Sequence, residues 1–185
     1  MNTRTMATLV IGGVSIATAA YAALFTSRSP EATRDNAKTD AQAIEDRREV
    51  PPGFREYHNP FYGISILYPD TFSVSEYPEP VTKLTTVFED PASDFTFQVH
   101  VLPYGDAQIT ETRLKLDIPS GIMRNPLDIM VGGVRATMFE SEDASLGATR
   151  EVWFLNGGFL YEVTTPLAHD AALSEIMRSW EFIYR

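Results

Sequence analysis

The chain has 185 residues, a formal net charge of −10 and no cysteine. Without cysteine, disulfides, thiol catalysis, thiolate zinc sites, iron–sulfur clusters and thioether lipid anchors are excluded. Because 25 acidic side chains outnumber 15 basic ones, nucleic acid is not expected as a partner, since phosphate binding needs clustered lysine and arginine. The composition, 44% hydrophobic and 22% charged, is typical of a globular protein.

The N-terminal segment predicts a membrane anchor. Residues 5–27 carry no charge and lie between Arg4 and Arg28, and a helix that spans a bilayer needs about 20 apolar residues. We therefore expect residues 1–26 to be a signal anchor that attaches the chain to the membrane through residues 5–27. The alternative is a signal peptide cleaved after Ala-Tyr-Ala at residues 20–22, although the apolar run continues past that site. Because a long domain follows the span, this single-pass topology places the C-terminal domain outside the cytoplasm.

A polar segment separates this anchor from the rest of the chain. Residues 27–53 contain almost no bulky apolar side chain and end in Pro51-Pro52-Gly53. Such a segment cannot bury enough surface to offset its ordering entropy, so we expect a disordered tether. The Pro-Pro-Gly sequence marks the start of a domain at residues 54–185. This domain holds nine basic and nineteen acidic side chains, and therefore the whole net charge.

Alternation of apolar and polar residues dominates the domain and predicts a mostly β structure. The clearest run is residues 95–102, in which phenylalanine and valine share one face and threonine, glutamine and histidine share the other. Shorter runs with the same period lie at residues 64–68 and 84–88. Another begins at Phe72 and is expected to end at Pro78 and Pro80.

Two glycine pairs predict hairpins. Asn156-Gly157-Gly158 is expected to join residues 151–155 to residues 159–165, because Asn-Gly supplies the positive φ angles of a tight turn. Gly132-Gly133 is expected to join residues 127–131 to residues 134–140 in the same way. Apolar side chains occur on both faces of the strand after Arg150, which predicts a central strand covered on both sides.

Two segments predict helices. Thr110 can cap a short helix that runs to Asp117, with apolar residues at the positions of a hydrophobic staple. A second helix is expected over residues 168–179, where Leu173, Ile176, Met177 and Trp180 form one apolar stripe. A strand at residues 180–184 then ends the domain. We therefore expect an α+β fold, with one antiparallel sheet of seven or eight strands and helices packed on it.

The start and the end of the domain resemble the PsbP-like family. Residues 62–69, Tyr-Gly-Ile-Ser-Ile-Leu-Tyr-Pro, with Phe-Ser-Val at residues 72–74, resemble the family's opening pattern "YGFSF-YP…W-V", although phenylalanine stands in place of tryptophan. The ending is similar too: Gly-Phe-Leu-Tyr-Glu-Val at residues 158–163, a helix, and Ser-Trp-Glu-Phe at residues 179–182. The Val-Gly-Gly-Val hairpin at residues 131–134 also fits.

This resemblance covers about residues 54–184 and implies an αβα sandwich that binds other proteins and has no catalytic machinery. The family includes PsbP, the extrinsic subunit of the oxygen-evolving photosystem, and the eukaryotic Mog proteins that bind Ran share its fold. No metal-binding or photosystem-binding motif of PsbP matches this sequence, so the resemblance assigns no functional residue. The anchor and tether are similar to bacterial envelope versions of the module.

The sequence contains no catalytic or metal-binding motif with the required spacing. Its three histidines do not form H-E-x-x-H, no serine lies in G-x-S-x-G, and no glycine run matches a nucleotide-binding loop. We therefore expect no catalytic residue, cofactor or metal. The carboxylates Glu89, Asp90 and Asp94 resemble a loose cation-binding loop, without the spacing of a known one. Tyr77 and Tyr104, each next to a proline, are the candidates for an interaction surface, since exposed aromatic groups suit protein recognition.

These observations favour one function and leave two alternatives open. The favoured hypothesis is a non-catalytic, membrane-anchored, extracytoplasmic module that binds or assembles with an unidentified membrane or envelope protein. One alternative is an envelope protein that binds a small ligand or a cation. The other is an enzyme with a composite carboxylate site, which would need a pocket that holds ionisable groups with shifted pKa values.

Overall fold

The computed structural model describes residues 48–118 and 120–183, and from Val50 onward they form one compact unit. The predicted anchor, residues 1–26, and most of the predicted tether lie outside the described residues. Both therefore stay predictions. Of the helices in the described part, none combines the length and the apolar character that a membrane span requires.

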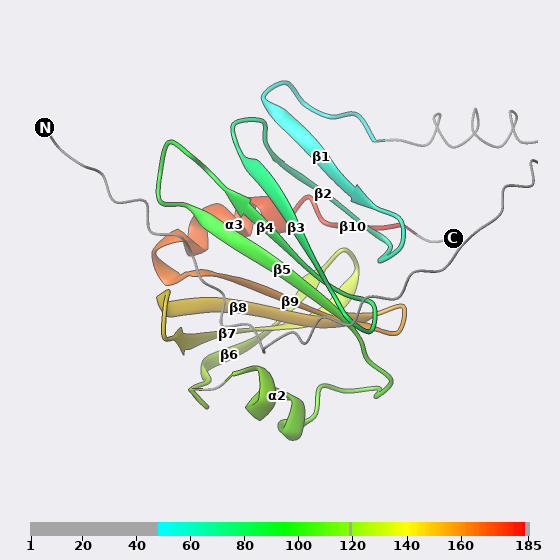
Figure 1. The fold of residues 1–185 in the computed structure, drawn as a ribbon, viewed down its shortest axis with the longest axis vertical. Coiled ribbons are helices and arrows are strands. Elements are labelled where there is room, and N and C mark those ends of the chain that lie inside the picture. Colours follow the sequence, from blue (N-terminus) through cyan, green and yellow to red (C-terminus); the bar gives the residue numbers. More distant parts are fainter. Residues whose placement is uncertain (1–47, 119, 184–185) are drawn as a thin grey trace, which may run out of the picture. The chain divides into compact units, whose positions relative to one another are not determined.

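Ten strands in the described part of the chain form two antiparallel sheets (Figure 1). They are β1 (Phe54–Asn59), β2 (Ile64–Pro69), β3 (Ser73–Glu79), β4 (Lys83–Glu89), β5 (Thr96–Pro103), β6 (Arg124–Val131), β7 (Val134–Asp143), β8 (Gly147–Asn156), β9 (Phe159–Pro166) and β10 (Glu181–Phe182). The large sheet has seven strands in the order β3-β4-β5-β9-β8-β7-β6, and the small sheet has the order β1-β2-β10.

The prediction of one sheet is therefore wrong, although the large sheet has the predicted size. The small sheet is separate from the large sheet, and its side chains pack on one face of the large sheet. From β1, the ring of Tyr57 meets that of Phe88 on β4 edge to face at 5.4 Å, and from β2 the ring of Tyr68 does so at 5.3 Å. The Tyr161 hydroxyl on β9 also donates to the backbone carbonyl of Tyr62, just before β2, at 2.5 Å.

Helices lie on both sides of the large sheet (Figure 1). Helix α2 (Glu111–Asp117) covers one face, where Ile118 packs with Phe139 and Trp153. Helix α3 (Asp170–Met177), which follows the short 3-10 helix η1 (Leu167–His169), lies with the small sheet on the other face. The two tryptophans of the chain therefore lie on opposite faces of the large sheet, since Trp180 belongs to the core on the α3 side.

Several predicted elements are confirmed. In β5 the alternating Phe97, Val99 and Val101 are at most 1% exposed, while the residues between them are half-buried. Strand β8 is central and buried on both faces. All four residues of the predicted stripe near α3 are buried, and the side chain of Thr110 accepts the backbone N–H of Arg113 as the α2 cap.

Other predictions need correction. Asn156 pairs with Phe159, so Gly157 and Gly158, with φ angles of 59° and 83°, form the turn in place of Asn-Gly. Strand β3 passes through Pro78, because β3 is an edge strand, where a missing N–H breaks no ladder. Strand β1 gives no signal of apolar alternation in the sequence, because Tyr57 is its one buried residue.

Candidate functional site

Ionisable side chains gather on the face of the large sheet that α2 covers. The register places Thr85, His100, Glu162 and Trp153 side by side across β4, β5, β9 and β8. The Thr85 hydroxyl lies 2.8 Å from Nδ1 of His100, and burial lowers the pKa of this histidine. Glu151 of β8 lies in the next row, opposite Thr164 of β9. Two buried carboxyl groups thus lie near each other on a sheet face that also carries Thr85, His100 and Thr164.

Glu151 is 6% exposed and fully engaged by donors. Its carboxylate accepts the hydroxyls of Thr149 at 2.8 Å and Thr164 at 2.7 Å, and the indole N–H of Trp153 at 3.3 Å. Burial raises the pKa of Glu151, and these three hydrogen bonds oppose that rise. The carboxylate therefore organises the polar groups around it.

Glu162 is 7% exposed, and its Oε1 has no hydrogen-bond partner in the described part of the chain. Burial, followed by the neighbouring Asp117 carboxylate, raises the pKa of Glu162 from 4.5 to about 10, while Arg113 acts in the opposite direction. Burial beside Asp117 therefore favours the neutral, protonated form of Glu162. The sequence signal for both glutamates is a single acidic residue inside a strand that is otherwise apolar.

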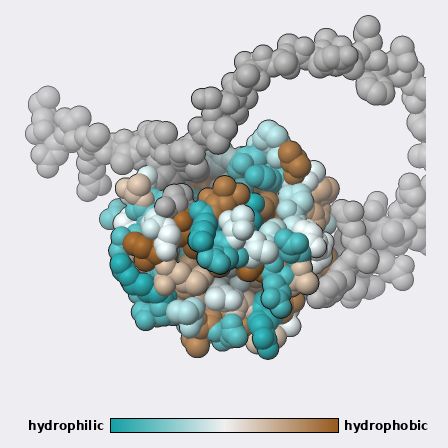
Figure 2. Space-filling view, turned by 90° about the horizontal axis from the view of Figure 1, so that it is seen from below, coloured by the Kyte–Doolittle hydropathy of each residue, from teal (hydrophilic) through white to brown (hydrophobic). Residues whose placement is uncertain are grey.

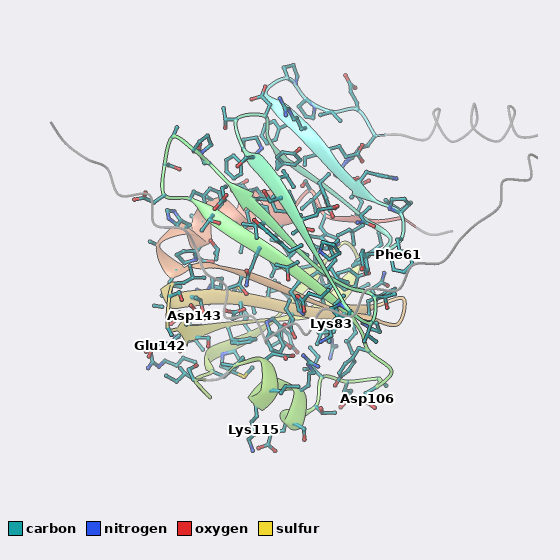
Figure 3. All side chains as sticks on the ribbon, in the orientation of Figure 1. Phe61, Lys83, Asp106, Lys115, Glu142 and Asp143 are labelled. Carbon is teal, nitrogen blue, oxygen red and sulfur yellow. The ribbon has the colours of Figure 1, made fainter. Side chains whose placement is uncertain are left out.

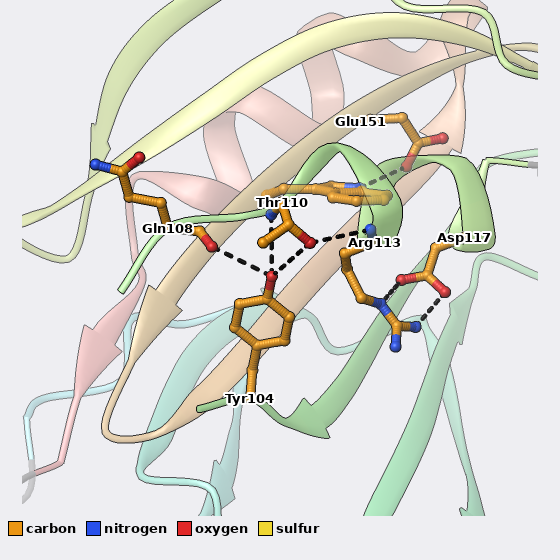
Figure 4. Close-up of polar contacts among 7 residues, drawn as sticks. Tyr104, Gln108, Thr110, Arg113, Asp117 and Glu151 are labelled. Atoms are coloured by element: carbon orange, nitrogen blue, oxygen red, sulfur yellow. Dashed lines mark hydrogen bonds and ion pairs between the residues drawn. The ribbon is translucent and has the colours of Figure 1, made fainter. Parts of the chain in front are cut away.

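Helix α2 and the loop before it close over this cluster (Figure 4). The Tyr104 hydroxyl accepts the backbone N–H of Thr110 at 3.0 Å and donates to the carbonyl of Gln108 at 3.2 Å, which fixes the loop at the start of the helix. Two nitrogens of the Arg113 guanidinium, Nε and Nη2, donate to the two carboxylate oxygens of Asp117. On the outer side of α2, Lys115 points to solvent (Figure 3) and is 70% exposed.

Replacing Tyr104 by phenylalanine is expected to loosen this loop without changing the fold. The variant loses the hydrogen bonds that hold the start of α2, which costs about 1 kcal/mol of local stability. Hydrogen exchange of the α2 backbone amides should become several times faster at this free-energy cost. Tyr77→Phe is the matched control, because Tyr77 is 51% exposed and lies on edge strand β3. Equal exchange rates in both variants would contradict the role of Tyr104.

The residues singled out from the sequence do not come together. Tyr77 lies on edge strand β3, whereas the half-buried Tyr104 anchors the loop before α2. Glu89, Asp90 and Asp94 lie around the β4–β5 turn, where Asp90 accepts the backbone N–H of Ala92 at 3.0 Å and the hydroxyl of Ser93 at 2.8 Å. Within residues 48–118 and 120–183, no three His, Asp or Glu side chains are grouped so that they could hold a metal ion.

In the described part of the chain, cavities open at the surface on both sides of the large sheet. One, of about 450 Å³, lies between α3 and the small sheet, with Phe54, Phe72, Phe95 and Ile176 in its apolar wall. The other, of about 590 Å³, lies on the α2 side, with Asp128, Arg135 and Trp153 in its mixed wall. Figure 2 looks onto the α2 side and shows apolar surface among hydrophilic side chains. Neither cavity is lined by Glu151 or Glu162.

Strand β6 forms one edge of the large sheet. Leu127 and Met130 on this strand are 55% and 66% exposed. From sequence, the apolar residues from Leu127 onward resemble a core strand, whereas Pro126 just before them is typical of an edge strand. Both edge strands carry a proline, Pro126 in β6 and Pro78 in β3, which discourages pairing with another strand at those positions.

No protein-family model and no curated protein matches the chain. Among solved structures, the solution structure of cyanobacterial PsbP (CyanoP) from Synechocystis sp. PCC 6803 is similar, with a TM-score of 0.52 and 14% sequence identity. The likeness covers 71% of this chain and 94% of that chain. At this identity it shows the fold alone. The predicted likeness is confirmed at that level: the domain has a PsbP-like fold.

Proposed function

We propose that the chain is a non-catalytic protein-binding module, held at the outer side of a bacterial cell membrane by its N-terminal anchor. The observation that supports binding is the open edge at β6, where no described strand follows and the side chains of Leu127 and Met130 are exposed. The PsbP-like fold agrees with this role, because the family resemblance implies a protein-binding domain.

The arrangement of the two buried glutamates speaks against the composite carboxylate enzyme. A general acid or base must come within hydrogen-bond reach of a substrate. Glu151 already accepts three donors from its own sheet, and Glu162 is 7% exposed. Their shifted pKa values follow from burial beneath α2, and neither group lines a described cavity.

The anchor and the topology are tested by single-cysteine labelling, which the cysteine-free sequence makes specific. In the full chain, Ala92→Cys places a thiol on the exposed β4–β5 turn, and Asn2→Cys places one before the apolar segment. A membrane-impermeant maleimide should label Ala92→Cys in intact spheroplasts, whereas it should label Asn2→Cys only after the cells are lysed. Loss of residue 2 from the mature chain would support the cleaved signal peptide, and labelling of Ala92→Cys after lysis alone would overturn the topology.

A second candidate function is the binding of a small apolar ligand, and the α3 cavity favours it. Its volume of about 450 Å³ lies within the range of ligand pockets, and its wall carries three phenylalanines. Ala172 also lines this cavity, so Ala172→Phe should fill part of it. The full chain should bind 8-anilinonaphthalene-1-sulfonate, and this variant should bind it more weakly. Equal binding by both proteins would remove this candidate.

A further inference from the structure

We infer that the β6 edge accepts an extended segment of a partner protein, which adds an eighth antiparallel strand to the large sheet. The inference rests on the proposed protein-binding function and names its site and the chemistry of its partner. Addition of a strand to an exposed sheet edge is a general mode of peptide recognition, in which backbone hydrogen bonds give affinity and side-chain contacts give specificity.

The backbone of β6 has hydrogen-bonding groups directed away from the sheet. The β6–β7 hairpin has a two-residue turn, with Val131 paired to Val134 and Ile129 paired to Ala136. In such a hairpin the residues that flank the turn bond to each other, and bonded positions then alternate. The N–H and C=O groups of Asp128 and Met130 therefore point outward, where no described strand follows. The backbone of another extended strand can pair with these outward N–H and C=O groups.

Side chains on both faces of β6 extend this contact. Leu127 is paired with Met138, whose neighbour on β8 is Val152 of the main core, so Leu127 belongs to the α3 side of the sheet. Asp128 and Met130 lie on the α2 side, opposite Thr137 and Arg135. An added strand thus meets one exposed apolar side chain on each face.

The cavity on the α2 side lies beside this edge. Its wall includes Asp128 of β6, Arg135 of β7 and Gln108 of the loop before α2. Alternate side chains of an added strand point to the same face. One side chain of the partner can therefore enter this cavity, where charged and amide groups favour a polar or charged tip on an apolar stem.

Charge decides between a partner segment and a second copy of this chain. Residues 54–185 carry nineteen acidic and nine basic side chains, so two copies repel each other, and a symmetric pairing centred on Asp128 would oppose two carboxylates. Like charges directly opposite each other destabilise paired strands. The edge therefore suits an extended segment that is apolar at alternate positions and carries lysine or arginine opposite Asp128.

The test is to pan a phage-displayed library of linear peptides against the full chain in detergent micelles. Enriched peptides should alternate apolar and basic residues. Met130→Pro removes one outward N–H and places a ring at the edge, so it should weaken their binding by about tenfold or more. Asp128→Lys should weaken binding of the basic peptides while it leaves the backbone intact. Val81→Ser, at an apolar residue that is 79% exposed on the β3–β4 turn, is the matched control and should bind normally.

Each other outcome overturns the inference. These are a library without enriched peptides, equal binding by Met130→Pro and the wild type, and a dimer in sedimentation that Met130→Pro dissociates, which would make a second copy the occupant. Far-UV circular dichroism confirms that the variants fold. If a membrane partner cross-links equally to wild type and Met130→Pro, the edge is wrong and the proposed function stands. If the chain is not in the membrane, the proposed location fails while the peptide result is unaffected.

Discussion

Replacing Glu162 by glutamine is expected to stabilise the protein at neutral pH, and the gain should grow as the pH rises. Burial raises the pKa of Glu162 from 4.5 to about 10, because the charged form has no water around it and lies near Asp117. Below pH 4.5 the side chain is protonated in both folded and unfolded protein. Above this pH the unfolded chain loses the proton while the folded chain keeps it, so stability falls as the pH rises towards 10.

The size of this effect follows from the difference in bound protons. One proton held by the folded state alone costs roughly 1 kcal/mol of unfolding free energy for each pH unit. Glutamine has nearly the shape of the protonated acid and does not titrate, so Glu162→Gln removes this slope. Three ionisable groups around the site, Asp117 and Arg113 on α2 and Glu151 on β8, are unchanged in the variant.

Urea unfolding followed by tryptophan fluorescence at pH 6, 7.5 and 9 measures this difference. The wild type should lose stability over this range, while Glu162→Gln should lose much less. Glu89→Gln, at an exposed glutamate on the end of β4, is the control and should run parallel to the wild type. Parallel curves for Glu162→Gln and the wild type would show that the buried acid is not held neutral.

The strands of the large sheet could be predicted because their signal is local. A period of two with one buried face, as in β5, is visible in eight successive residues, and the Thr110 cap of α2 spans four. The division into two sheets has no such signal. Strand β2 pairs with β1 beside it and with Phe182 near the other end of the domain, and alternation does not state which strands become neighbours.

The candidate sites show the same limit. Glu162 is marked in the sequence as an acid between Tyr161 and Val163, yet its burial depends on α2, which begins about fifty residues earlier. The exposure of the β6 edge is harder to predict, because Leu127 and Met130 would also fit a core strand. Pro126 is typical of an edge strand, and the strand order shows which side of β6 is open. Residue types therefore predict the elements, and topology decides which groups are exposed.

Replacing Gly132 by alanine is expected to destabilise the protein much more than the same change at Gly157. Both glycines open a two-residue hairpin turn, with φ angles of 54° and 59°. Each alanine is therefore strained by a similar amount, about 1 kcal/mol. A Cβ at residue 157 meets nothing within 4 Å, whereas one at residue 132 would lie 2.9 Å from Cδ2 of Phe182 and 3.1 Å from Cδ1 of Trp180.

This contact should add about 1–3 kcal/mol to the cost of Gly132→Ala, since Phe182 and Trp180 are both buried and overpacking forces them to shift. The difference in unfolding free energy between the two alanine variants isolates the contact from the backbone strain that they share. The emission of Trp180 should also change in Gly132→Ala, which can be resolved in a Trp153→Phe background. Equal costs would show that β10 can move aside. A cost specific to residue 132 would show that the C-terminal strand holds the turn at which the open β6 edge ends.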